Sequence, residues 1–271
     1  MSIEKRQSAL STLSVLQAQT SDSTVFTKIS LAEFVKDLAQ RVQNPDGINQ
    51  AHLNICGAAT FIRFWLMTDP ESYVKTAFDL YKNGKAQYKN IPLVAHVDMY
   101  ANRTHLNLID WLMASALQNA GGLVGYSPVN EMGGIRGIAL PSKVQEWMAA
   151  LPNMQVESVA RAASVDTINS TLQQDGFVAL LVNVNALDNY FTNASYRAED
   201  KSFMDKMKTA LNSVTGNHYV ALNTPIAAKE DGSLRFEVWT WATSLEVVMP
   251  HTELSNCIAQ TFLIRPVKTF A

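Results

Sequence analysis

The feature that most constrains the fold is a change in the spacing of apolar residues near the middle of the chain. The second half holds short apolar runs rich in β-branched and aromatic residues, which are typical of strands. Helices followed by antiparallel strands predict an α+β domain. In the first half, apolar side chains recur at helical spacing, as in residues 30–43 at Leu31, Phe34, Val35, Leu38 and Val42.

Five helices are predicted in the first half after residue 29, and residues 30–43 form the first. Residues 55–67 are apolar nearly all round, which indicates a helix buried at the centre of a domain. Asp69 should cap the next helix, with Pro70 in its first turn and Gly84 closing it. The Asn-Pro-Asp-Gly sequence at 44–47 indicates a turn. The other two predicted helices span residues 104–119 and 141–150.

The second half should form an antiparallel sheet. A turn at residues 229–232 is expected to join the strands at 219–222 and 234–241 as a hairpin. We therefore predict one domain of 271 residues. Its parts are an N-terminal extension (1–29), a mainly helical part (30–150) and a mainly β part (151–271), with strands at 177–184, 219–222, 234–241 and 261–267.

Charge and hydropathy exclude several partner classes. The net charge is −2 and no basic run occurs, so nucleic acid is not an expected partner. No stretch approaches 18 apolar residues and the N-terminus lacks the apolar core of a signal peptide, so no membrane partner is expected. We expect a cytoplasmic protein whose export would need a dedicated secretion machine.

Neither a metal nor an organic cofactor is expected. Cys56 and Cys257 are far apart in the sequence, and no His, Cys, Asp and Glu residues have metal-ligand spacing. The glycine-rich residues 133–137 lack the Lys-Ser/Thr of a phosphate-binding loop. Two thiols without a disulfide framework fit a reducing compartment.

Cys56 is the candidate nucleophile because it stands where a turn enters the buried apolar helix. A helix N-terminus favours the thiolate, and its backbone N–H groups can hold an oxyanion. Gly57 would let a substrate approach the backbone, and the side-chain amide of Gln50 could supply a second oxyanion donor. The alternative is that Cys56 is a buried packing residue.

His218 is the candidate base. It opens a predicted strand after a polar turn that contains Gly216, so the sheet would hold its backbone while the ring reaches a thiol. The alternative is a surface histidine at the start of a strand. The other histidines lie in the helical half or in a predicted loop, at His52, His96, His105 and His251.

These motifs resemble the papain-like cysteine peptidase superfamily. The resemblance rests on Gln50-x5-Cys56-Gly-Ala-Ala at a helix start and Gly-Asn-His218-Tyr-Val-Ala-Leu at a strand start. It is closest to bacterial branches with a C-G-P/A-A helix opening and an H-W/Y-V strand, and the chain is also similar to poorly characterised bacterial toxin or effector-type proteins. About half the chain is covered.

The resemblance implies a fold and an activity. A helical part carrying the cysteine would pack on an antiparallel sheet carrying the histidine. The activity would be a cysteine hydrolase that cleaves an amide bond, in a protein or in cell-wall peptide, through a thioester. Acyltransferases share that intermediate. A toxin would also have an immunity or inhibitor protein as partner.

The chain departs from the superfamily at the residue that orients the histidine. That residue is usually Asn or Asp on the following strand, and residues 236–242 contain neither. Strand alternation puts Thr240 on one face and Glu237 on the other, so only one of them can serve. We favour Thr240. The missing carboxylate keeps a second interpretation open, a catalytically silent binding or accessory module in which Cys56 is structural.

Overall fold

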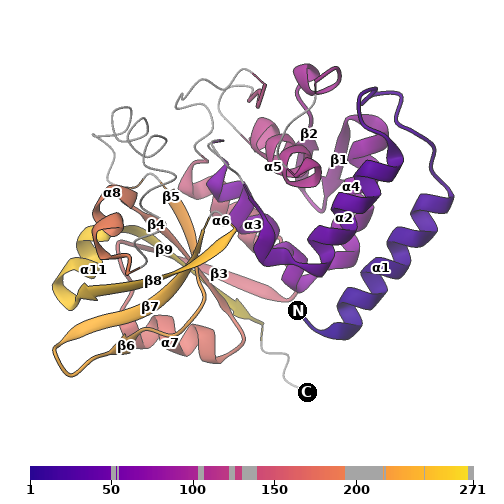
Figure 1. Ribbon diagram of the computed structural model, residues 1–271. Helices are drawn as coiled ribbons and strands as arrows, with labels where there is room; N and C mark the ends of the chain where they lie inside the picture. Colours follow the sequence, from indigo (N-terminus) through magenta and orange to yellow (C-terminus); the bar gives the residue numbers. More distant parts are fainter. Residues whose placement is uncertain are drawn as a thin grey trace. The chain divides into compact units, whose positions relative to one another are not determined.

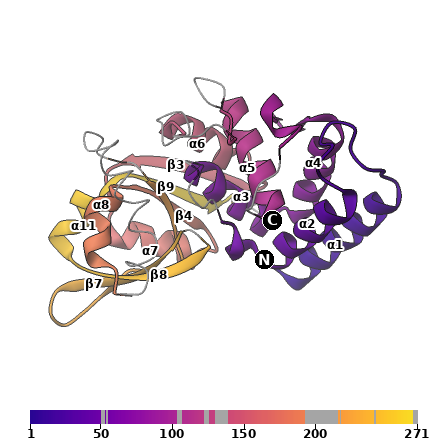
Figure 2. The same ribbon diagram turned by 45° about the horizontal axis from the view of Figure 1, so that its top comes forward.

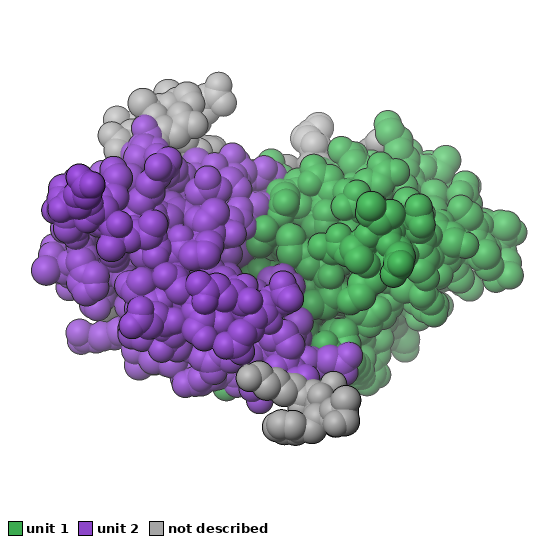
Figure 3. Space-filling model, turned by 90° about the horizontal axis from the view of Figure 1, so that it is seen from below, with its two compact units in different colours: residues 1–152 green, residues 153–271 purple. Residues whose placement is uncertain are grey.

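The chain divides into two compact units, residues 1–152 and residues 153–271 (Figure 3). Its class is α+β, as predicted, with an antiparallel sheet in the second unit. The computed structural model describes residues 1–49, 53, 55–102, 107–121, 126–129, 139–192, 216, 218–240 and 242–267. Among these, no helix has both the length and the apolar character needed to cross a bilayer.

The first unit is built mainly from helices, with one antiparallel pair of short strands (Figure 1). Helix α1 packs against α2 and α4, whereas α3 contacts α4, α5 and α6. Strand β2 packs on α5. The elements are α1 (Ile3–Ala18), α2 (Leu31–Gln43), η1 (Pro45–Gly47), α3 (Cys56–Thr68), α4 (Pro70–Asn83), β1 (Lys85–Tyr88), β2 (Ile91–Val94), η2 (Val97–Met99), α5 (Leu108–Gly121) and α6 (Pro141–Ala149).

Local capping explains where α2 begins and where α4 begins and ends. The Ser30 hydroxyl accepts from the Glu33 N–H, and the Glu33 carboxylate accepts from the Ser30 N–H, which makes a capping box. Asp69 caps α4 by accepting from Ser72 N–H, and Gly84 closes that helix in the left-handed conformation at φ 68°. The predicted capping of α4 is confirmed.

Helix α1 was not predicted, and residues 3–18 lie in what the sequence indicated as an extension. Its apolar residues form no continuous stripe, because Ala9 and Leu13 are buried while Ile3 and Val15 are exposed. Contacts with the rest of the unit hold α1 in place. Among them, Lys5 Nζ donates to the Thr68 carbonyl at 2.8 Å.

Helix α3 forms the centre of the first unit. Every residue from Cys56 to Thr68 except Met67 is buried, which confirms the prediction from its apolar sequence. Trp65 packs its ring against Tyr73 and Tyr88 and donates its indole N–H to Ser72. A helix enclosed on all sides gives its first residue a fixed position in the unit.

The second unit is a seven-stranded antiparallel sheet that curls on itself (Figure 2). Its strand order is β3-β9-β4-β5-β7-β6, with β8 also paired to β7. Helix α7 packs on β4 and β9, and α11 on β8 and β9. The elements are β3 (Met154–Ala160), α7 (Val165–Gln173), β4 (Phe177–Val182), α8 (Val184–Leu187), η4 (Asp188–Tyr190), β5 (His218–Leu222), β6 (Ala227–Ala228), β7 (Ser233–Thr240), β8 (Thr243–Pro250), α11 (His251–Cys257) and β9 (Ile258–Pro266).

The predicted hairpin between β5 and β7 is wrong in one respect. The turn at 229–232, with Gly232 at φ 79°, joins β7 to the two-residue strand β6. Strand β5 also pairs with β7, but toward its other end, where Ala221 faces Trp239. Strand β8 was missed, although Leu245, Val247 and Met249 alternate as buried residues along it.

The capping of α4 gives a test of the helical unit. Asp69→Ala should lower the free energy of unfolding by about 1 kcal/mol, because the N–H of Ser72 loses its acceptor. Asp79→Ala on the same helix is the matched control, since Asp79 is exposed and should change stability by less than about 0.5 kcal/mol. Urea unfolding followed by circular dichroism measures both. Equal effects would contradict the capping role.

Candidate functional site

Cys56 is the first residue of α3, at the N-terminal end of the buried helix where the sequence predicts it. Its side chain is 6% exposed. The preceding residue, Ile55, occupies the N-cap position and has no side-chain acceptor for the amides of the first turn. These amides and the helix dipole favour a negative charge at this end of the helix, as on a thiolate or an oxyanion.

His218 is the first residue of β5, which lies between β4 and β7. It faces Val182 across the ladder and is 1% exposed, so it is not a surface histidine at a strand end. Gly216, two residues before His218, lies close to neighbouring side chains. A Cβ at Gly216 would lie 2.6 Å from the Cβ of Ala259 and 2.7 Å from Cγ of Leu181, so glycine is required there.

Thr240 contacts the imidazole. Its Oγ1 lies 2.6 Å from Nε2 of His218, in a buried hydrogen bond between the last residue of β7 and the first of β5. Alternation along β7 places Glu237 on the opposite face of the sheet from Thr240. Of the two proposed orienting residues, Thr240 therefore makes the expected contact.

The environment of His218 keeps its ring uncharged. Burial lowers the pKa of His218 to about 3, because the imidazolium would lose its hydration. A threonine hydroxyl can bond to Nε2 but carries no negative charge to offset that loss. At neutral pH the ring is therefore a neutral imidazole, with one nitrogen protonated and the other able to accept a proton.

The remaining predicted site residues are placed as follows. Cys56 belongs to the first unit, whereas His218 and Thr240 belong to the second. The pairing of Cys56 with His218 stays a prediction. Gln50 lies outside the described residues, and so do His52, His105 and the glycine-rich residues 133–137.

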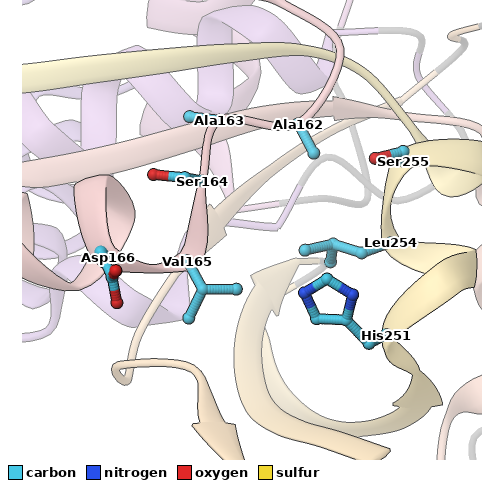
Figure 4. Close-up of a pocket in the computed structure, with 8 residues that line it drawn as sticks. All are labelled: Ala162, Ala163, Ser164, Val165, Asp166, His251, Leu254 and Ser255. Atoms are coloured by element: carbon cyan, nitrogen blue, oxygen red, sulfur yellow. The ribbon is translucent and has the colours of Figure 1, made fainter.

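A cavity of about 400 Å³ opens elsewhere in the second unit (Figure 4). His251 and Leu254 form one wall, facing Val165 (Figure 4). Ser164 is already engaged, because its hydroxyl caps α7. Neither His218 nor Thr240 lines this cavity, so it is separate from the predicted site. Its full lining is Ala162, Ala163, Ser164, Val165, Asp166, His251, Leu254 and Ser255.

Cys257, the other cysteine, is in an environment unsuited to a nucleophile. It lies at the end of α11 and is 1% exposed. Burial, with a smaller effect of the Glu253 carboxylate, raises the pKa of its thiol to about 11. Within the part of the chain that the structure describes, no group of three His, Cys, Asp or Glu residues could hold a metal ion.

No protein-family model, no curated protein and no solved structure matches this chain. The chemistry of the site therefore rests on the positions of Cys56, His218 and Thr240 within their own units.

Burial of His218 predicts a specific pH dependence of stability. Its pKa is lowered from 6.5 to about 3 in the folded protein, so the unfolded state takes up the proton first as pH falls. The contribution of His218 to stability is complete above about pH 6.5. As pH falls from 6.5 toward 3, this contribution to the free energy of unfolding should decrease by at most about 1.4 kcal/mol per pH unit.

Urea unfolding of wild type and His218→Gln between pH 7.5 and pH 4 measures this dependence. The variant should be less stable at neutral pH but show a flatter pH profile. Identical slopes in the two proteins would contradict the burial of an uncharged imidazole.

Proposed function

We propose that the protein is a papain-like cysteine hydrolase that cleaves an amide bond. Cys56 is its nucleophile, His218 its base and Thr240 the residue that orients the imidazole. The observation that carries the proposal is the 2.6 Å hydrogen bond between His218 and Thr240. A buried histidine held by a neighbouring strand, in a chain whose thiol opens a buried helix, supports this assignment.

The hydrogen bond assigns different tasks to the two ring nitrogens. Nε2 bonds to Thr240, and we assign the acid–base exchange to Nδ1. In the proposed reaction Nδ1 accepts the proton of the Cys56 thiol, and the sulfur attacks the carbonyl carbon of the substrate. Nδ1 then returns the proton to the leaving amine, which departs as the C–N bond breaks.

The oxyanion is proposed to bind at the start of α3. The backbone N–H of Cys56 and the side-chain amide of Gln50 would donate to it. Water then attacks the thioester carbon, Nδ1 accepts its proton and returns it to the sulfur of Cys56 as the C–S bond breaks, and the acid product leaves. If an amine reaches the thioester instead of water, the same residues carry out acyl transfer, which is the second activity that the site supports.

Electrostatics indicate a slow enzyme in the state seen here. A ring whose pKa is lowered to about 3 is a weak base for a thiol. The helix N-terminus compensates in part, because it stabilises the thiolate. An anionic sulfur beside the ring would in turn raise the pKa of His218, so the two groups would ionise as a pair.

The proposed substrate is an amide of a protein or of cell-wall peptide, and the proposed context is a bacterial effector or toxin with an immunity or inhibitor protein as partner. A catalytically silent binding module is the second candidate. Its support is the same low pKa of His218 together with the uncharged orienting residue. The reactivity of the Cys56 thiol distinguishes the two.

Iodoacetamide labelling should separate Cys56 from Cys257 in native protein. If Cys56 is an activated nucleophile, the midpoint of its labelling rate against pH should lie below the free-thiol pKa of about 8.5. Cys257 is the internal control and should stay unmodified until the protein unfolds, since its pKa is raised to about 11. Mass spectrometry of the two cysteine peptides across pH 5–10 gives both profiles. An unreactive Cys56 would favour the silent module.

Substitutions on β7 test the orienting role. Thr240→Val should lower kcat by about 10-fold, because Nε2 of His218 loses its hydrogen-bond partner in a buried site. Thr240→Ser keeps the hydroxyl and should restore most of the activity. Glu237→Gln is the control on the other face and should leave activity nearly unchanged.

Cys56→Ala should abolish activity without loss of folding. All variants are compared with wild type in one fluorogenic peptide or cell-wall peptide assay, with circular dichroism to check the fold. Damage from Glu237→Gln but not from Thr240→Val would show that a carboxylate orients the ring.

A further inference from the structure

A buried ion pair in the first unit contacts the segment that leads to the thiol helix. Arg41 of α2 and Asp110 of α5 are 2% and 1% exposed. Their pairing is bidentate, since Nε and Nη2 of Arg41 each donate to a different oxygen of Asp110 at 2.6 Å. Both side chains also bond to the backbone of residues 44–49.

The two ends of that segment are tied to the pair. Nη1 of Arg41 donates to the carbonyl of Asn44 at 2.8 Å, and the Oδ2 atom of Asp110 accepts from the N–H of Asn49 at 2.9 Å. The pair thus spans 44–49 like a clamp, which we call the Arg41–Asp110 clamp. Cys56 begins α3 seven residues after Asn49.

The segment between those ends is fitted to the clamp. A Cβ at Gly47 would lie 2.7 Å from Nη1 of Arg41, so a larger residue there would displace the guanidinium. The 3-10 turn η1 also contacts α3. There Arg63 of α3 pairs with Asp46 at 2.7 Å. Ile48 is 1% exposed, which adds an apolar anchor.

Energetics favour a positioning role over a stabilising one. A buried ion pair often contributes no more to stability than apolar residues of the same volume. What apolar residues could not supply is a hydrogen-bond donor for Asn44 and an acceptor for Asn49. The distinctive effect of this pair is therefore the fixed path of the backbone at 44–49.

We propose that Arg41 and Asp110 are positioning residues that hold the segment entering the thiol helix, and so set the reactivity of Cys56. The consequence for Cys56 rests on the proposed function, whereas the effect of the clamp on residues 44–49 does not. Sequence analysis missed both residues, because they lie 69 positions apart and each belongs to a regular helix.

Asp110 makes the clamp sensitive to acid. Burial raises the pKa of Asp110 from 3.8 to about 6, while Arg41 and the N–H of Asn49 lower it. Among the described residues, Asp37 also raises the pKa of Asp110, and the buried Tyr73 of α4 interacts electrostatically with it. Protonation below about pH 6 removes the negative charge that holds Arg41 and Asn49.

Protonation of Asp110 therefore loosens the segment at 44–49. It does not make the folded unit less stable in acid. Since its folded pKa lies above the unfolded value, the folded state takes up the proton first between about pH 6 and pH 4. The contribution of Asp110 to global stability therefore rises as pH falls through that range. As pH falls through this range, the protection of the Asn49 N–H should therefore decrease while the contribution of Asp110 to global stability increases.

Amide hydrogen exchange of the whole chain, followed by NMR, tests the clamp. The test variant combines Arg41→Met with Asp110→Leu, which removes the tether without leaving one charge buried alone. In it the Asn49 N–H should exchange about 10–100-fold faster than in wild type, because its charged acceptor is gone. The Gly84 N–H, bonded to the Leu80 carbonyl at 2.8 Å, is the reference amide and should be unchanged.

Lys75→Met is the control. It removes an ion pair with Glu71 on α4, and the side chains of both residues are exposed (58% and 39%), so exchange at Asn49 should change by less than about 3-fold. In wild type, the protection of the Asn49 N–H relative to Gly84 should fall below about pH 6. This measurement uses the wild-type protein alone, so it tests the clamp even if the double variant fails to fold.

Iodoacetamide labelling of the same proteins measures the effect of the clamp on the reactivity of the Cys56 thiol. In the folded double variant, the pH midpoint of Cys56 labelling should rise toward the free-thiol pKa of about 8.5. Unchanged protection of Asn49 in both the variant and the wild-type titration would overturn the clamp. Lost protection with an unchanged Cys56 profile would overturn its positioning role. A wild-type Cys56 that never reacts would reject the proposed hydrolase, while the exchange data would still decide the clamp.

Discussion

Burial of an imidazole in the second unit is the constraint on which the candidate site depends. His218 is 1% exposed at the start of β5, so its ring must find a hydrogen-bond partner inside the sheet. Thr240 supplies it from the end of β7, and the ladder register between these strands brings the two residues together. Gly216 is tied to the same constraint, because only glycine passes between Leu181 and Ala259 on the way into β5.

Features that depend on residues close together in the sequence could be predicted. The cap at Asp69, the stop at Gly84 and the apolar helix beginning at Cys56 follow from propensities that act within one turn. The contact of Thr240 with His218 also followed, although the two are 22 positions apart. Strand alternation left Thr240 as the only polar side chain on one face of residues 236–240, so a period of two was sufficient.

Features that depend on distant partners could not be predicted. Arg41 reads as a charged residue near the end of α2 and Asp110 as an acidic residue in the first turn of α5, which are favourable positions for exposed charges. Their burial follows from the packing of α2 on α5, which no local pattern encodes. Helix α1 is a similar case, because it is held by contacts with α2 and α4 and lacks a continuous apolar stripe of its own.

The two buried polar sites respond to pH in opposite ways, and this separates their effects. Burial disfavours charge in both, so it lowers the pKa of His218 to about 3 and raises that of Asp110 to about 6. Between these values His218 is neutral while Asp110 is largely protonated. In the state described here, a step in Cys56 reactivity near pH 6 that is separate from the titration of the thiol itself would therefore come from the clamp in the first unit, since the imidazole does not titrate there. Replacing Asp110 would remove that separate step, whereas replacing Thr240 would leave it in place.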